Sequence, residues 1–379
     1  MRTTESGTTV SREASIPDVP FNDLGRGTAL LRPQLDAAIA RVLSSGWYVL
    51  GPEHNALEVE LGTYVGTAHA VGVGNGTDAL QLAMSALGVT AGDTVLTAAN
   101  AGGYASTAAR SLGAEPVFAD VDPQTLLLTV ATIDEALERL PTVPKVIVIT
   151  HLFGAAADIM EMVVWAHERS ILVIEDCAQS LGAYTTGVRA GSVADAATTS
   201  FYPTKNLGAL GDAGAVFTSD DATAARLRQL RQYGWGSKYR TTVEGGRNSR
   251  LDELQAAVLR TKLPHLDDWN ERRREIHTRY EAAIGSGGRL VNVSSPAFVG
   301  HLAVVEVDDR PRTIAILAEH GVRSDVHYPI ADHHQPIAQH APVSLPVTEA
   351  AAQRIISVPL FPELTASEVS RVSAALAAI

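Results

Sequence analysis

Lys205 lies in a sequence setting that suits a chemically reactive amine. It follows the apolar, strand-like run 196–201 and precedes the glycine-rich stretch 208–214. Glycine lets the backbone approach a ligand closely. A lysine in such a cleft can lose its proton and attack a carbonyl carbon. The pattern therefore predicts a ligand site built around an amine nucleophile.

A carboxylate and an amide occur twenty-nine and twenty-six residues before this lysine, where the apolar run 171–174 ends in Glu175-Asp176-Cys177-Ala178-Gln179. A carboxylate at the carboxyl end of a buried parallel strand points into the crevice where α/β proteins bind ligands. Pyridoxal 5′-phosphate (PLP) needs such a group, because a carboxylate keeps its ring nitrogen protonated and the protonated ring withdraws electrons. We therefore expect Lys205 to form the Schiff base with PLP, Asp176 to contact the ring nitrogen and Gln179 to contact the phenolic oxygen.

A phosphate site is predicted at the segment Gly74-Asn-Gly76-Thr77-Asp78, between a predicted strand and a predicted helix. Free N–H groups and the helix dipole favour an anion there, and the hydroxyls of Thr77 and Ser200 can add to them. The segment also suits an ordinary capped turn. A dinucleotide loop fits less well, because the glycine spacing is wrong and Asp93 precedes its strand instead of ending it.

The elements that must position these residues alternate between helix and strand. Apolar residues at helical spacing predict a helix over 30–44 and another after Asp78. Several strand candidates are continuous runs of Val, Ile and Leu, as expected where both faces of a parallel sheet are covered; the candidates are 68–73, 94–98, 116–119, 145–150, 171–175, 196–201 and 214–218. We predict a doubly wound α/β fold, with a mostly parallel seven-stranded sheet flanked by helices.

The pattern changes after about residue 250. A long helical region over 250–284, interrupted by Pro264, precedes two short strands (289–293 and 302–307) and three helices (311–320, 347–355 and 366–377). We divide the chain into a disordered tail (1–18), a large PLP-binding α/β domain (19–250) and a smaller C-terminal α+β domain that includes the linking helix (251–379).

Composition excludes several classes of function. The 379 residues are 46% hydrophobic and 19% charged, and the net charge of −12 argues against a nucleic-acid partner. No apolar run reaches the roughly 20 residues of a membrane span, and residues 1–18 lack the apolar core of a signal peptide. Cys177 is the only cysteine, which suits a small buried residue and a cytoplasmic protein without disulfides. The histidines 327, 333, 334 and 340 match no standard metal motif, so we expect no metal.

Longer motifs extend this interpretation to nearly the whole chain. It resembles the DegT/DnrJ/EryC1/StrS family of nucleotide-sugar aminotransferases from 19–24 to 358–362, in the runs Gly76-Thr-Asp-Ala-Leu80, Glu175-Asp-Cys-Ala-Gln179, Ser200-Phe-Tyr-Pro-Thr-Lys-Asn-Leu-Gly208, Gly211-Asp-Ala-Gly-Ala215 and Asn248-Ser-Arg-Leu-Asp-Glu-Leu-Gln-Ala256. The resemblance implies the type I aminotransferase fold and a homodimer whose active sites lie at the subunit interface.

The resemblance also implies roles for individual residues. Lys205, Asp176 and Gln179 keep the roles given above. Gly76, Thr77 and Ser200 would bind the phosphate, and Asn248 would reach it from the neighbouring subunit, although Asn248 also suits a helix N-cap before Leu251.

One departure from the family pattern concerns the cofactor ring. Most members place an aromatic residue after an Asn-Thr pair, to stack on the ring. Here the sequence is Asn100-Ala-Gly102-Gly-Tyr104, so Gly102 fills that position and Tyr104, two residues on, is the candidate for stacking.

Three residues are candidates for the substrate side: His327 in the His-Tyr-Pro run, Trp47 and Tyr239. Trp47 suits the core equally well, and the segment 232–240 that contains Tyr239 equally suits a solvated loop.

The predicted function is transfer of an amino group from L-glutamate or glutamine to a keto-6-deoxysugar linked to a nucleotide diphosphate, most simply a dTDP-3-keto sugar. A 4-keto sugar or a cyclitol would use the same catalytic set. The family's dehydratases carry histidine in place of the lysine, so Lys205 argues against that branch. The intact pair of Lys205 and Asp176 argues against a PLP-binding regulator without enzyme activity.

Overall fold

The computed structural model describes residues 18–338 and 343–379. The predicted disordered tail, apart from Asp18, and His340 lie outside the described residues. In the described part of the chain, no helix is long and apolar enough to cross a membrane.

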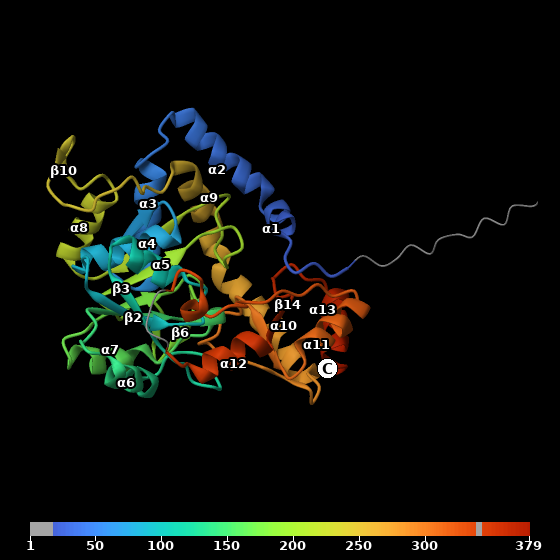
Figure 1. Cartoon of the computed structure of the whole chain (residues 1–379). Helices are drawn as coiled ribbons and strands as arrows, with labels where there is room; N and C mark the ends of the chain where they lie inside the picture. Colours follow the sequence, from blue (N-terminus) through green and yellow to red (C-terminus); the bar gives the residue numbers. More distant parts are fainter. Residues whose placement is uncertain (1–17, 339–342) are drawn as a thin grey trace, which may run out of the picture.

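The centre of the fold is a seven-stranded sheet in the order β1-β9-β8-β5-β4-β2-β3 (Figure 1). Strand β9 is antiparallel to both of its neighbours, β1 and β8, and the remaining pairs are parallel. The strands are β1 (His69–Val73), β2 (Thr94–Ala98), β3 (Glu115–Ala119), β4 (Val146–Thr150), β5 (Leu172–Asp176), β8 (Ala196–Ser200) and β9 (Gly214–Thr218). The predicted mostly parallel seven-stranded sheet is confirmed.

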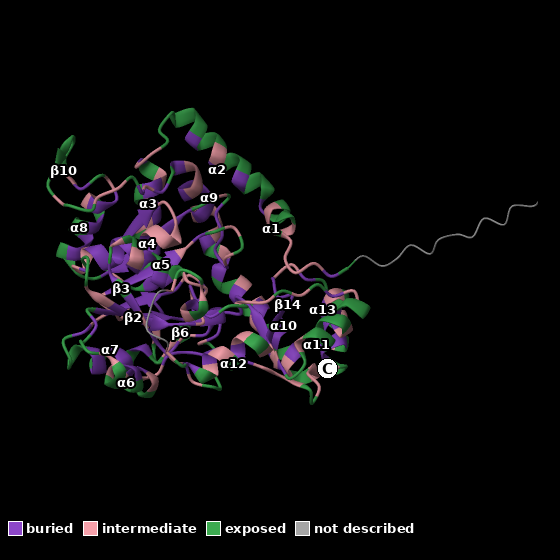
Figure 2. Cartoon of the chain, in the orientation of Figure 1, coloured by how far each residue is buried: buried purple, intermediate pink, exposed green. Residues whose placement is uncertain are grey.

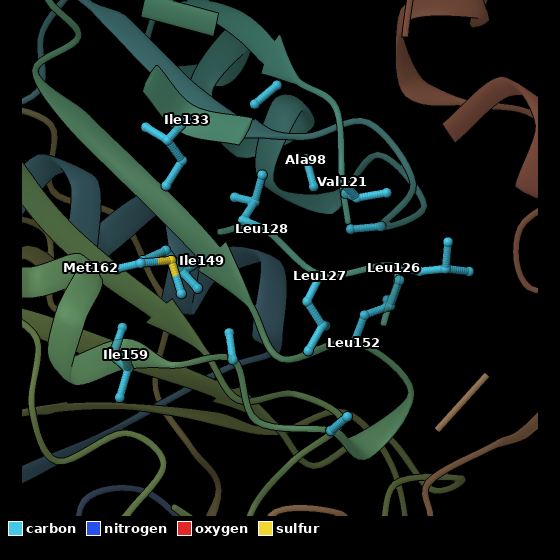
Figure 3. Close-up of a cluster of buried hydrophobic side chains, with 14 of the residues drawn as sticks. Ala98, Val121, Leu126, Leu127, Leu128, Ile133, Ile149, Leu152, Ile159 and Met162 are labelled. Atoms are coloured by element: carbon cyan, nitrogen blue, oxygen red, sulfur yellow. The ribbon is translucent and has the colours of Figure 1, made fainter. Parts of the chain in front are cut away.

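Helices cover both faces of this sheet, as the continuous apolar runs require. Along β4, Val146 and Val148 face one buried cluster while Ile147 and Ile149 face the other. Figure 3 shows the second cluster, where Ile149 lies near side chains of α6 and α7. Each fully buried side chain of this size contributes about 1.5–3 kcal/mol. The covering helices are α3 (Pro52–Val65), α4 (Gly76–Ala86), α5 (Tyr104–Ser111), α6 (Val130–Arg139), α7 (Ile159–His167) and α8 (Asp221–Leu230).

The predicted helical region 250–284 links this sheet to the C-terminal part. It comprises α9 (Glu253–Lys262), a 3-10 turn at Leu263–His265 and α10 (Leu266–Ala283), so Pro264 interrupts it as expected. Helix α9 packs on α3 and on α2 (Arg32–Ser45), which follows the short α1 (Leu24–Leu30). The outer side of α2 is exposed (Figure 2).

A second, antiparallel sheet of β12 (Gly288–Leu290), β13 (Ala303–Val307) and β14 (Ile355–Val358) lies in the C-terminal part. Its helices are α11 (Arg310–Glu319), α12 (Pro346–Arg354) and α13 (Ala366–Ala377), and α13 packs on α10. The helix expected over 347–355 ends one residue early, because Ile355 begins β14. We keep the boundary near residue 251 as a proposal.

Short elements complete the fold: a 3-10 turn at Leu152–Gly154, the hairpin β6 (Tyr184–Thr185) with β7 (Val188–Arg189), the hairpin β10 (Trp235–Ser237) with β11 (Arg240–Thr241), and a 3-10 turn at Asp332–His334.

The buried carboxylate of Glu253 joins α9 to the start of α3. Its Oε1 accepts hydrogen bonds from the backbone N–H groups of Gly51 and His54, both at 2.8 Å, and its Oε2 accepts one from Glu53 at 2.9 Å. Helix α3 has no side-chain cap of its own. Glu253 therefore satisfies N–H groups that the helix leaves free and places a negative charge at the positive end of its dipole.

We expect Glu253→Gln to lower the free energy of unfolding by about 1–3 kcal/mol, because an NH₂ group would then face backbone donors. Urea denaturation followed by circular dichroism measures this. The control is Glu138→Gln on the exposed end of α6, which should change stability by less than about 0.5 kcal/mol. Equal stability of the two variants would contradict the capping role.

Candidate active site

A cavity of about 710 Å³ lies at the carboxyl ends of β5 and β8. Asp176 ends β5 and Ser200 ends β8, and both line this cavity. Gly76 and Thr77, at the start of α4, and Lys205 line it too. Five residues from three distant segments of the sequence therefore meet at the sheet edge where α/β folds bind ligands.

Lys205 is held in a tight turn after β8. Its backbone N–H donates to the carbonyl of Tyr202 at 2.8 Å. Burial lowers the pKa of the ε-amine, and the negative charge of Asp176 opposes that shift. An amine whose pKa is lowered is available as a nucleophile and as a proton carrier closer to neutral pH.

Asp176 is the carboxylate that faces this amine. It is buried, and its Oδ1 accepts a hydrogen bond from the backbone N–H of Ala178 at 3.0 Å. Burial raises the pKa of Asp176, while the Ala178 N–H and the charge of Lys205 act in the opposite direction. A cationic group bound in the cavity would favour the ionised form of this carboxylate.

Glu175 points away from the cavity because successive side chains of a strand face opposite sides. It is fully buried and contacts Nε2 of His151 at 3.0 Å. Nδ1 of His151 accepts from the N–H of Ala157 at 3.0 Å, so the ring proton lies on Nε2. Burial alone would raise the pKa of Glu175, but hydrogen bonds from His151 and from the Gly191 N–H lower it overall. The hydrogen bonds of Glu175 and His151 are thus made within the protein and hold the strand ends together, whereas Asp176 faces the cavity.

The start of α4 has the features of an anion site. Oδ1 of Asn75 accepts from the N–H of Asp78 at 2.8 Å, which leaves the N–H groups of Gly76 and Thr77 without intrahelical partners. A Cβ atom at position 76 would lie 2.6 Å from Cβ of Ser200, so only glycine fits beside that side chain. Together with the helix dipole, these groups suit a phosphate.

These features fit PLP. The anion site suits its phosphate, the buried carboxylate of Asp176 suits its protonated ring nitrogen, and the amine of Lys205 suits its carbonyl carbon. Each property is present in the chain itself: N–H groups left free by the helix, a carboxyl group whose burial disfavours its charge, and an amine whose burial does the same.

Gln179 lies beside the cavity and does not line it. Its Oε1 accepts from the N–H of Phe153 at 2.7 Å, and its Nε2 donates to the hydroxyl of Tyr328 at 3.0 Å. Tyr328 lines the cavity. The contact of Gln179 with the ring oxygen therefore stays a prediction, and the structure adds Tyr328 as its direct partner.

Tyr328 also occupies the space beside Gly102. A Cβ atom at position 102 would lie 2.9 Å from the Tyr328 ring, and Gly102 has a positive φ of 80°. Tyr104 lines the cavity and contacts Tyr328 edge-on, with ring centroids 6.2 Å apart. Stacking of Tyr104 on the cofactor stays a prediction.

The candidates for the substrate side separate into two groups. His327 lines the cavity, with its Nδ1 2.9 Å from Oγ of Ser357 and its ring stacked on Phe21. Trp47 is 58% exposed and Tyr239, at the tip of the β10–β11 hairpin, is 78% exposed, and neither lines this cavity.

Asn248 is also exposed and lies outside the cavity; it forms a β-bridge with Gln232. Trp47, Tyr239 and Asn248 therefore lie outside the cavity that holds Lys205 and Asp176, and their roles stay predictions.

Tyr328 and His301 are among the cavity residues that sequence reasoning missed. Tyr328 follows His327 directly, so the His-Tyr-Pro run contained the signal for it. His301 lines the cavity just before β13 but belongs to no recognisable motif, and only the packing of the C-terminal part brings it to Lys205.

In the described residues, two groups have ligand atoms near enough to share a metal ion: His151, Glu175 and Cys177, and His333, His334 and Glu349. The hydrogen bonds of His151 and Glu175 already use the first group, and Nε2 of His333 lies 3.2 Å from Oε1 of Glu349 in the second. Neither group lines the cavity with Lys205.

Comparison with known proteins identifies the family. Residues 31–377 match the DegT/DnrJ/EryC1/StrS aminotransferase family. The chain belongs to this family. It is 40% identical to the erythromycin biosynthesis sensory transduction protein EryC1 of Saccharopolyspora erythraea, over 95% of this chain and 99% of that protein. It is also 40% identical to the dTDP-3-amino-3,4,6-trideoxy-alpha-D-glucose transaminase of Streptomyces venezuelae, over 96% of each chain.

Solved structures of family members agree with the fold. The structure of S. venezuelae DesV in complex with a ketimine intermediate superimposes with a TM-score of 0.92 and 38% identity, and covers 96% of this chain and 98% of that one. NtdA of Bacillus subtilis, with bound cofactor PMP, has a TM-score of 0.89 and 30% identity, and covers 97% and 85% of the two chains. The chain is therefore an aminotransferase-family enzyme with the type I fold predicted from its motifs.

A buried carboxylate also anchors the loop that carries Tyr104. Oδ2 of Asp332 lies 3.3 Å from the hydroxyl of Ser106, and the backbone N–H of Gly103 also donates to the carboxylate. The backbone N–H of Asp332 donates to the carbonyl of Ala99 at 2.8 Å. Burial raises the pKa of Asp332 to about 7. The folded protein therefore keeps this proton up to about pH 7.

We expect the stability of the wild type to fall between pH 4 and pH 7 through Asp332, because an unfolded aspartate, with a pKa of about 3.9, has already released its proton there. Asp332→Asn removes this dependence. The free energy of unfolding of the mutant minus that of the wild type should therefore rise by about 4 kcal/mol from pH 4 to pH 8. Denaturant unfolding at the two pH values measures the gain, and a constant difference would contradict it.

Proposed function

We propose that this protein is a PLP-dependent aminotransferase that moves an amino group from L-glutamate to a 3-keto-6-deoxysugar linked to dTDP. The observation that carries the proposal is the meeting of Lys205, Asp176 and the free start of α4 in one cavity. The family assignment supports the amino-transfer chemistry.

In this proposal PLP supplies the carbonyl group that carries the amine and the electron-withdrawing ring that makes the neighbouring proton removable. Gly76, Thr77 and Ser200 would hold its phosphate, and Asp176 would keep its ring nitrogen protonated. The charge of that nitrogen in turn favours the ionised form of the buried carboxylate.

Lys205 has two roles in succession. Its amine would first hold the cofactor, and the amino donor would then take its place there. The free Nζ then takes a proton from one carbon atom and returns it to another. This transfer requires an amine that is partly unprotonated near neutral pH, and burial lowers the pKa of Lys205 in that direction.

The names of the relatives support amination at C3. Those at 37–40% identity include the transaminases for dTDP-3-amino-3,4,6-trideoxy-alpha-D-glucose and for dTDP-3-amino-3,6-dideoxy-alpha-D-galactopyranose, and two enzymes named for UDP-linked 3-dehydro or 3-oxo sugars. All four names place the nitrogen or the ketone at C3. The dTDP-linked pair is the more similar to this chain, at 40% identity against 37%.

We further propose a homodimer in which each subunit completes the other's site. Asn248, Tyr239 and Trp47 are exposed in the single chain and lie outside its cavity, as residues that serve the partner's cavity would. Sedimentation of the purified protein tests the dimer. Mixing Lys205→Ala subunits with Asn248→Ala subunits tests the sharing, because the mixture should regain part of the activity that each variant lacks.

Two relatives bear regulatory names, EryC1 and the pleiotropic regulatory protein of Geobacillus stearothermophilus. A regulator that only binds PLP is therefore the second candidate. It would need no amine positioned for proton transfer, whereas Lys205 lines the same cavity as Asp176 and has a lowered pKa.

The test runs the reaction from the aminosugar side, where the substrates are stable. Purified protein with PLP and 2-oxoglutarate is given dTDP-linked 3-amino and 4-amino sugars, UDP-linked 3-amino sugars and an aminocyclitol. Mass spectrometry and NMR detect the ketone and the glutamate formed. Turnover of the dTDP-linked 3-amino sugar above the others supports the proposal, a preference for another substrate would reassign it, and none with any substrate favours the regulator.

Lys205→Ala should bind PLP without the visible absorption band of a lysine-linked cofactor, and its kcat should fall by at least about 10²–10⁴-fold through loss of the proton carrier. Absorbance spectra and steady-state kinetics measure both effects. The control is Lys145→Ala, at an exposed position before β4, which should keep the band and the activity. Turnover by Lys205→Ala at the wild-type rate would exclude the role given to this lysine.

A further inference from the structure

A chain of buried amides fixes the protonation of His301. Nδ2 of Asn206 donates to Oδ1 of Asn270 at 2.8 Å and to the carbonyl of Val299 at 3.0 Å. Nδ2 of Asn270 donates to the carbonyl of Leu181 at 3.1 Å. A backbone carbonyl can only accept, so each amide has one possible orientation. Oδ1 of Asn206 is therefore the atom that lies 3.0 Å from Nδ1 of His301, and this nitrogen must carry the ring proton.

The other ring nitrogen of His301 is left as an acceptor. His301 lines the same cavity as Lys205, and its Nε2 has no hydrogen-bond partner in the described part of the chain. Burial lowers the pKa of His301 well below its ordinary value, and the positive charges of Lys205, Arg273 and His327 lower it further. The ring is therefore neutral, and a neutral ring with its proton on Nδ1 has a lone pair on Nε2.

Lys205 is the group best suited to meet that lone pair. Lys205 has the largest electrostatic effect of the three basic groups that act on His301, and it lines the same cavity. Arg273 does not line this cavity, and burial lowers the pKa of His327. Arg273 uses its Nη1 for the carbonyls of Gly300 and Leu360, and Nδ1 of His327 is 2.9 Å from Oγ of Ser357. Asp176 is the charged group that acts on Lys205 from the other strand end.

We propose that His301 is a positioning residue for Lys205, and that its Nε2 is the acceptor for the free ε-amine when the Lys205 side chain turns toward it. Asn206 follows Lys205 directly in the chain, so one segment places both the amine and the amide that orients its acceptor. The catalytic meaning of this contact rests on the proposed function: it holds Nζ in place while the amine carries a proton between two carbon atoms. The contact itself involves only groups of this chain and needs neither cofactor nor substrate.

The proposed contact affects the pKa of Lys205 in one direction. A neutral acceptor stabilises the ammonium form more than the amine form, because hydrogen bonds from charged donors are the stronger ones. Removing the acceptor should therefore lower the pKa of Lys205. A hydrogen bond of this kind corresponds to a shift of about one pKa unit.

Two substitutions separate the cavity acceptor from the amide contact. In His301→Asn the short amide can reach Asn206 but not the cavity. In His301→Gln the longer amide places an oxygen near the position of Nε2. The measurement is the rate of acetylation of Lys205 in cofactor-free protein against pH, read by mass spectrometry, with circular dichroism to confirm that each variant is folded.

We expect the midpoint for Lys205 to fall by about one unit in His301→Asn and to stay near the wild-type value in His301→Gln. An unchanged midpoint in His301→Asn would overturn the proposal. An equal fall in both variants would overturn it too, since the effect would then come from packing and not from an acceptor. No sugar or amino donor is present, so failure of the proposed aminosugar activity would leave this result unaffected.

Discussion

The burial of Asp176 at the end of β5 is the constraint on which the rest of the site depends. An isolated carboxylate in a protein interior costs several kcal/mol unless it is paired and hydrogen-bonded. In the chain alone, this carboxylate has the N–H of Ala178 and the nearby charge of Lys205. Burial disfavours the charges of both Asp176 and Lys205, so each group has a pKa shifted toward its neutral form. A cofactor with a protonated nitrogen and a carbonyl carbon relieves both costs at once.

Much of this arrangement is predictable from sequence because it is local to single motifs. Strands 94–98 and 214–218 have the predicted limits, and the strands predicted over 171–175 and 196–201 end within one residue of the prediction, at Asp176 and Ser200. The reason is physical: a parallel strand buried on both faces leaves a continuous apolar run, and its carboxyl end faces the ligand crevice. The break at Pro264 is predictable for a similar reason, since proline lacks the N–H that a continuous helix needs.

What the sequence does not reveal depends on contacts between distant segments. Strand β14 is four residues long and directly follows a helix, so its apolar pattern is too short to predict a separate strand. His301 has no motif around it, and its orientation follows from Asn206, which lies 95 residues away in the chain. Tyr328 fills the space beside Gly102, across two segments whose pairing no periodicity encodes. Periodicity predicts elements, whereas these contacts follow from how the elements pack.

The two parts of the fold contribute different residues to the cavity. The seven-stranded sheet and α4 supply the groups suited to the cofactor: Asp176, Lys205, and the start of α4 with Ser200 beside it. The C-terminal part supplies His301, His327 and Tyr328, and the fit of Tyr328 against Gly102 requires that no side chain stand at position 102. A larger residue at position 102 would therefore require a smaller one at position 328. Under the proposed function, His327 is the member of this second set through which substrate preference can vary while the cofactor groups stay fixed, and the relatives of this fold are named for different nucleotide sugars.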